Sequence, residues 1–177
     1  MNPGEAAVID AGEPVAVAAV RAIRAVDVAA LEEQLRERPD LATARPERNG
    51  VGRTLLHVVT DWPGHFPNGA ASVAALVGAG ADVNAPVTGP HAETPLHWAA
   101  SSDDVEVLDG LLDAGADIDA PAAVVAGGSP LRDATAFGQV VGRSPARRTG
   151  RTNDKLRRGG PRARRSAGGR LRAGEAR

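Results

Sequence analysis

The sequence contains no cysteine, and its 177 residues include only four aromatic side chains, two tryptophans and two phenylalanines. The lack of cysteine excludes disulfides, thiolate metal sites and a cysteine nucleophile, and it fits a reducing compartment. No apolar run approaches the roughly 20 residues that a membrane helix needs. Acidic residues precede the apolar stretch 15–20, and Arg21 and Arg24 interrupt it, so the N-terminus does not predict a signal peptide. We expect a soluble, cytoplasmic protein with no membrane contact.

The net charge of −1 conceals two segments of opposite charge. Residues 1–142 carry 8 lysines and arginines against 20 aspartates and glutamates, a balance of −12, whereas residues 143–177 carry 13 against 2, a balance of +11. The first segment is rich in alanine, valine, leucine and aspartate with helical periodicity, and the second in arginine, glycine, proline and serine without an apolar period. We therefore place the domain boundary near residue 140.

Two short motifs recur in the same order along the first segment. "RTLLHVV" at 53–59 aligns with "ETPLHWA" at 93–99, an offset of 40, and "GADVNAP" at 80–86 aligns with "GADIDAP" at 115–121, an offset of 35. A third start, "GSPLRDATAFGQ" at 128–139, places Ser129 35 residues after Thr94. The first copy has five extra residues, and they lie within "DWPGHFPNG" at 61–69.

This combination of motifs resembles the ankyrin repeat, whose unit has about 33 residues. The resemblance implies an all-α solenoid of helix-turn-helix repeats with hairpin-like turns, and it assigns structural roles to the motif residues Thr54, His57, Gly80, Asp82, Thr94, Pro95, Leu96, His97, Gly115 and Asp117. It also implies that the two histidines hydrogen-bond backbone groups between adjacent units. Because a helix pair this short cannot bury its own apolar face, stacked neighbours must complete the core.

Local chemistry supports the same elements. Thr94 can cap a first helix with Pro95 at its first position, and Asp103 with Glu106 reads as a capping box for the second helix. In the upstream copy Asn68 can cap the second helix, and Gly80 can end it. Core residues of the clearest copy recur at helical spacing, namely Val105, Leu108, Leu111 and Leu112.

An N-terminal capping repeat is predicted before residue 49. Asp27 can begin its second helix, and three leucines, Leu31, Leu35 and Leu41, are expected to face inward. The predicted organisation is a flexible N-terminus (1–13), a repeat domain (14–139) and a disordered basic tail (140–177). The repeat domain comprises a cap (14–48), two repeats (49–85 and 86–120) and a truncated repeat (121–139).

The sequence contains no motif that predicts catalysis. His57 and His97 occupy equivalent positions, which favours an architectural role, and no H-E-x-x-H or comparable ligand spacing accompanies His65 and His91. No nucleophile elbow or phosphate-binding glycine motif surrounds the serines or glycines. We expect no enzyme activity and no cofactor; a metal-dependent hydrolase with a site built from loops is a distant third alternative.

Noncovalent binding of a protein partner is the expected function, with the partner unidentified and the chain monomeric. The predicted contact surface is the concave groove with the inserted loop 61–69, and its residues are Asp61, Trp62, His65, Phe66, His91, Ser101, Ser102 and Phe137. An alternative interpretation is that Trp62 and Phe66 fold onto each other, or onto Pro63 and Pro67, to pack the insertion.

The basic tail supports two further hypotheses. Its arginines would attract nucleic acid, so an adaptor with nonspecific affinity for nucleic acid is the second function considered, and its binding should weaken steeply as salt rises. Alternatively, the switch in composition after about Gln139 indicates a shifted reading frame. Leucine-patterned helices ending in a "GA" turn in another frame of the coding DNA would support that explanation.

Overall fold

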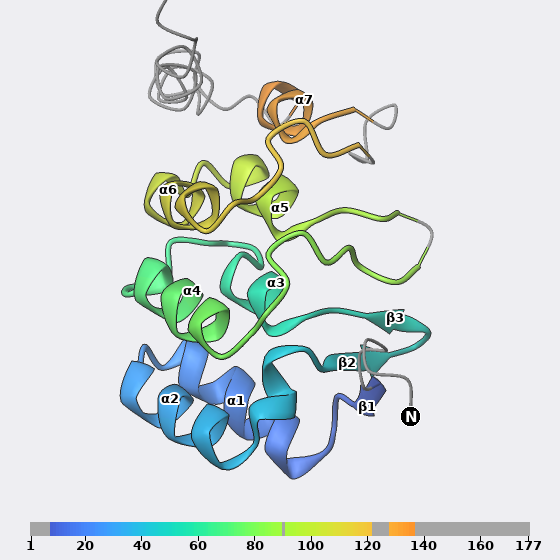
Figure 1. The fold of residues 1–177 in the computed structure, drawn as a ribbon. Coiled ribbons are helices and arrows are strands. Elements are labelled where there is room, and N and C mark those ends of the chain that lie inside the picture. Colours follow the sequence, from blue (N-terminus) through green and yellow to red (C-terminus); the bar gives the residue numbers. More distant parts are fainter. Residues whose placement is uncertain (1–7, 90, 122–127, 137–177) are drawn as a thin grey trace, which may run out of the picture.

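The chain forms successive pairs of short helices in a computed structural model that describes residues 8–89, 91–121 and 128–136 (Figure 1). The first pair is α1 (Pro14–Arg24) and α2 (Val28–Glu37), followed by the short 3-10 helix η1 (Pro39–Ala42). The second and third pairs are α3 (Leu55–Val59) with α4 (Gly69–Gly78) and α5 (Pro95–Ser101) with α6 (Val105–Asp113). A further first helix, α7 (Pro130–Ala136), follows.

The pairs stack in chain order. Each first helix packs on the next first helix, α1 on α3, α3 on α5 and α5 on α7, while α2 packs on α4 and α4 on α6. Helices far apart in sequence therefore pack mainly on their equivalents in the neighbouring pair. This is the arrangement expected of a helical repeat fold.

The first helices of the two clear copies begin identically. In each copy the backbone N–H of the threonine, Thr54 or Thr94, donates to Nδ1 of the histidine three residues later at 3.2 Å. In the reciprocal half of this capping box, each threonine side chain accepts the backbone N–H of the same histidine. The predicted start at Thr94 is confirmed.

The second helices also end identically, at glycines in the left-handed region. Gly80 has φ of 100° and Gly115 has φ of 95°. The next residue in each case donates its N–H back into the helix, Ala81 to Leu76 and Ala116 to Leu111, both at 2.9 Å. These bonds satisfy carbonyls that a helix end would otherwise leave unpaired, as the sequence predicts.

The starts of the second helices differ from the prediction. Asp104 rather than Asp103 caps α6, and its Oδ1 accepts the N–H of Val107 at 3.3 Å. Asp103 has a left-handed φ of 56°, which turns the chain one residue before the cap. Asn68 occupies the N-cap position of α4 but its side chain makes no capping bond, because this residue is itself left-handed with φ of 61°.

The N-terminal helix pair follows the prediction closely. The Asp27 side chain accepts the N–H of Ala30 at 3.0 Å at the start of α2. The three leucines predicted to face inward, Leu31, Leu35 and Leu41, are all buried. This pair forms one end of the stack and covers α3 and α4.

A small sheet departs from the all-α expectation. Strands β2 (Arg45–Arg48) and β3 (Val51–Gly52) form an antiparallel hairpin, and β1 (Val8–Asp10) pairs with β2 in parallel, Val8 opposite Arg45. A single bridge joins Gly52 to Thr88 of the next hairpin. Residues 8–10, predicted as part of a flexible N-terminus, are thus ordered by pairing with a distant segment.

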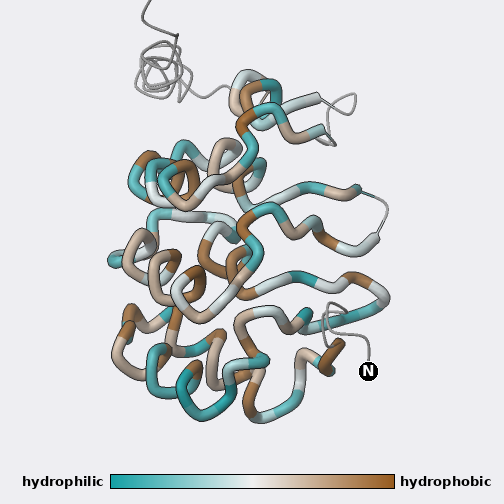
Figure 2. The backbone as a smooth tube through the Cα atoms, in the orientation of Figure 1, coloured by the Kyte–Doolittle hydropathy of each residue, from teal (hydrophilic) through white to brown (hydrophobic). Residues whose placement is uncertain are grey.

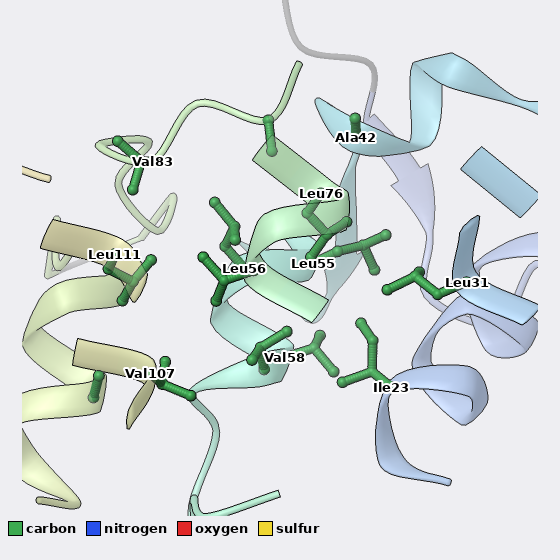
Figure 3. Packing of buried hydrophobic residues seen from close by; sticks show 14 of the residues in the cluster. Ile23, Leu31, Ala42, Leu55, Leu56, Val58, Leu76, Val83, Val107 and Leu111 are labelled. Carbon is green, nitrogen blue, oxygen red and sulfur yellow. The ribbon is translucent and has the colours of Figure 1, made fainter. Parts of the chain in front are cut away.

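The core runs through the stack between neighbouring pairs. Buried side chains from successive helices point toward one another, among them Ile23, Leu31, Leu55, Leu76 and Leu111 (Figure 3). Hydrophobic segments recur in each layer of helices along the chain (Figure 2). In α6 the buried residues are Val107, Leu108 and Leu111, whereas Val105 and Leu112, predicted as core, are only half-buried.

Candidate protein-binding site

The connection between α3 and α4 is longer than its counterpart. Residues 60–68 join α3 to α4, whereas only residues 102–104 join α5 to α6. The extra residues of the first copy therefore lie between its two helices, as predicted. The longer connection packs against the shorter one.

Asp104 holds these two connections together. Its Oδ2 accepts the backbone N–H of His65 at 2.6 Å, while Oδ1 caps α6. The His65 Nε2 lies 2.9 Å from the carbonyl oxygen of Ser102. Gly64, with φ of 72°, lies so close that an added Cβ would meet Ser102 Oγ at 2.8 Å. The inserted loop is thus fixed to the next repeat.

Replacing Asp104 with alanine should cost more than loss of an ordinary helix cap. A lost cap typically destabilises by about 1 kcal/mol, and loss of the part-buried, charge-assisted bond to the N–H of His65 would add about 1–3 kcal/mol. Asp27→Ala is the matched control because Asp27 caps α2 without holding a loop. Urea unfolding measures both, and equal losses in the two variants would contradict the anchoring role of Asp104.

A pocket of about 210 Å³ opens beside this junction. Its lining comes from the end of α3 and the inserted loop on one side and from α5 with its flanking residues on the other: Thr60, Asp61, Trp62, Glu93, Trp98, Ser101 and Ser102. The Trp62 side chain is 85% exposed, which makes it the most exposed of the large hydrophobic residues in the described chain. The pocket thus offers indole surface to solvent.

Trp98 forms a fixed wall of the pocket. Its Nε1 donates to Glu93 Oε2 at 3.0 Å, and its ring meets the His57 ring edge-on at 5.0 Å between centroids. The Arg53 guanidinium lies 5.1 Å from the Trp98 ring centroid, within the range of a cation–π contact. These three partners hold the indole in one orientation.

Asp61 carries an ion-pair network at the edge of the pocket. Its Oδ2 lies 3.3 Å from Arg24 and 3.7 Å from Arg53, and its Oδ1 accepts the backbone N–H of Trp62 at 3.1 Å. Both arginines are about half-exposed, so these pairs contribute little to stability. Their effect is to position the start of the inserted loop.

His57 joins the two repeats from inside. Its Nδ1 accepts from Thr54, so Nε2 carries the proton and donates to the carbonyl oxygen of Glu93 at 3.1 Å. Burial lowers the His57 pKa to about 3. Burial also lowers the pKa of His97, which is equally inaccessible. Both rings are neutral at neutral pH and act as parts of the scaffold, as the resemblance implies.

The third helix pair matches a known protein family. Residues 92–123, which contain α5, α6 and the turn after them, match the family model of the ankyrin repeat. This segment of the chain is an ankyrin repeat. No curated protein matches its sequence. Ankyrin repeats generally mediate protein–protein interactions.

The ankyrin stack brings together half of the residues predicted for binding. Asp61, Trp62, Ser101 and Ser102 line the pocket. His65 contacts Ser102 behind them, Phe66 is half-buried outside the lining, and His91 is exposed at a distance along the chain. Phe137 lies outside the described residues. The exposure of Trp62 argues against the alternative in which its ring packs the insertion.

Three pocket residues were missing from the predicted set. Trp98 of α5 is half-buried and lines the pocket with Thr60 and Glu93. The sequence does distinguish Trp98 from its counterpart, because the equivalent position of the first copy is a valine, Val58. An aromatic residue that one repeat has and its neighbour lacks is a candidate for binding rather than for stacking.

The ankyrin domain contains no metal centre in the part of the chain that the structure describes: no group of three or more His, Cys, Asp or Glu side chains could hold an ion there. Among the same residues no helix is long and apolar enough to cross a bilayer.

Proposed function

We propose that this protein binds a protein partner through the pocket and the inserted loop 61–69, in the groove formed by the first helices and the hairpins. The observation that carries the proposal is the 85% exposed Trp62 at the mouth of a pocket walled by Trp98. Large aromatic side chains dominate many interfaces, and leaving one in water has no benefit for the isolated fold. The structural unit is a solenoid of a cap (14–48), two repeats (49–85 and 86–120) and a third start at 121–139.

The rigidity of the loop supports the same function. Asp104, Ser102 and the left-handed residue Gly64 fix the loop to the next repeat, so Trp62 is presented from a preformed position. A preorganised surface loses little conformational entropy on binding.

Replacing Trp62 and Phe66 together with alanine should abolish partner capture and leave the thermal midpoint nearly unchanged. Hot-spot truncations cost roughly 2 kcal/mol or more in binding, which is about a thirtyfold loss of affinity. The measurement is affinity capture from the source cell with quantitative mass spectrometry, using the full chain as bait. Glu32→Ala is the control, because Glu32 is exposed on α2, a second helix, and lies outside the pocket lining.

Two results would contradict the proposal in different ways. If the double variant unfolds, the aromatic residues belong to the loop core. If it folds and captures the same proteins as the unmodified chain, the binding surface lies elsewhere.

A further inference from the structure

The pocket is lined by residues of a segment that is acidic in sequence, and two arginines from the preceding segment, Arg24 and Arg53, pair with Asp61 at its edge. Between Arg53 and Arg132 the sequence has ten aspartates and glutamates and no lysine or arginine. Two of these acidic residues come soon after Ser101 and Ser102 of the pocket wall: Asp103 is the next residue, and Glu106 lies in the first turn of α6. Such a surface attracts cationic segments.

One arginine of the same chain already contacts the pocket residues. Arg53 places its guanidinium 5.1 Å from the Trp98 ring centroid and 3.7 Å from Asp61 Oδ2. Trp62, on the opposite wall, is 85% exposed. A second guanidinium on that indole would repeat the arrangement that Arg53 makes with Trp98.

An arginine-rich segment of the same chain follows α7 in the sequence. Ala136, the last described residue, lies 35 residues after Ser101, the same offset that relates Ser129 to Thr94. It therefore ends α7 at the position equivalent to a pocket residue, and α7 packs directly on α5 (Figure 1). From Ala136 to Arg143 the chain can span up to about 23 Å, more than twice the roughly 10 Å length of a seven-residue helix such as α5.

We propose that residues 143–177 dock in cis on the pocket, with guanidinium groups on Trp62 and opposite the acidic start of α6, and so compete with the partner. The segment carries 13 lysines and arginines against two acidic residues, which complements the surface it would meet. Tethering gives it a millimolar effective concentration, so weak contacts are sufficient for occupancy. The competition rests on the proposed function, whereas the docking does not.

The exposure of Trp62 in the full chain tests this docking. Both tryptophans are labelled as 5-fluorotryptophan, Trp62→Phe assigns the two fluorine signals, and a soluble gadolinium chelate reports their accessibility. In the test variant Arg147, Arg148, Arg157, Arg158, Arg164 and Arg165 become glutamine, and in the matched control the same six become lysine. We expect Trp62 to be at least about twofold more accessible in the glutamine variant at low salt, with the lysine control in between.

Raising the salt concentration should make Trp62 more accessible without any substitution. At about 1 M salt the Debye length falls to about 3 Å, so Trp62 of the unmodified chain should become as accessible as in the glutamine variant. Trp98 is the internal reference because its indole is already fixed by Glu93 and Arg53. Protection of Trp62 should not depend on protein concentration, since the docking is intramolecular.

Several outcomes overturn the inference. Equal accessibility of Trp62 in the unmodified and glutamine chains at low salt would show that the tail does not dock there. Full protection by the lysine control would exclude stacking of guanidinium groups, and protection that rises with protein concentration would assign the tail to a second copy. In each case loss of capture by the Trp62 and Phe66 variant would still support the proposed function, so the two failures are distinguishable.

Discussion

Acidification should unfold this domain between pH 6.5 and about 3, because the folded state holds buried neutral histidines. The pKa of His57 is lowered from 6.5 to about 3 by burial, so below pH 6.5 the unfolded chain binds a proton that the folded chain does not. The contribution of each such histidine to the free energy of unfolding is therefore fully present above pH 6.5. As the pH falls below 6.5, this contribution decreases by about 1.4 kcal/mol per pH unit. For His57 alone the total loss approaches about 5 kcal/mol, comparable to the stability of many small domains.

The control for this prediction is His57→Gln. A glutamine at the third helical position can keep the capping box with Thr54 but does not titrate. Between pH 6 and pH 5, urea unfolding should show a pH slope that is smaller by nearly one proton in the variant than in the unmodified chain. Parallel curves for the two proteins would mean that His57 is not held neutral by the fold.

Replacing Leu111 with alanine should lower the free energy of unfolding by about 2–5 kcal/mol. Leu111 is fully buried where α6 meets its neighbours, so the substitution leaves a cavity that the stack closes only in part. Leu112→Ala is the matched control, because Leu112 is adjacent in sequence and only half-buried. We expect a clearly smaller loss for that variant, measured by the same urea unfolding.

A loss below about 0.5 kcal/mol for Leu111→Ala would show that the core is placed wrongly. Equal losses at both positions would show that α6 is rotated about its axis relative to the structure.

Much of the helical scaffold follows from local chemistry. Thr94 with Pro95, Asp27 and Gly115 each act within one turn of helix, so their roles could be read from the sequence without knowledge of the neighbours. The single-residue error at Asp103 has a local cause as well. Two consecutive aspartates can both cap a helix, and only the left-handed φ of 56° at Asp103 decides between them.

The sheet and the pocket depend on contacts that sequence periodicity does not reveal. Val8–Asp10 is a strand only because β2 lies beside it, and three residues carry no readable alternation. The β2–β3 hairpin did have a signal, since Asn49 and Gly50 both have positive φ and this pair is typical of a tight hairpin turn. Trp98 is held at the pocket by the His57 ring and the Arg53 guanidinium, and Glu93 by a hydrogen bond from His57, and these contacts with the preceding repeat are defined only by the fold.

Glu93 belongs to two systems at once. Its carbonyl oxygen accepts the bond from His57 that ties one repeat to the next, and its carboxylate holds the indole of Trp98 at the pocket. Any ligand that restrains this indole therefore also restrains Glu93, whose carbonyl oxygen forms the hydrogen bond to His57 of the preceding repeat. Occupancy of the pocket and cohesion of the stack are thermodynamically linked, and each must strengthen the other by the same free energy.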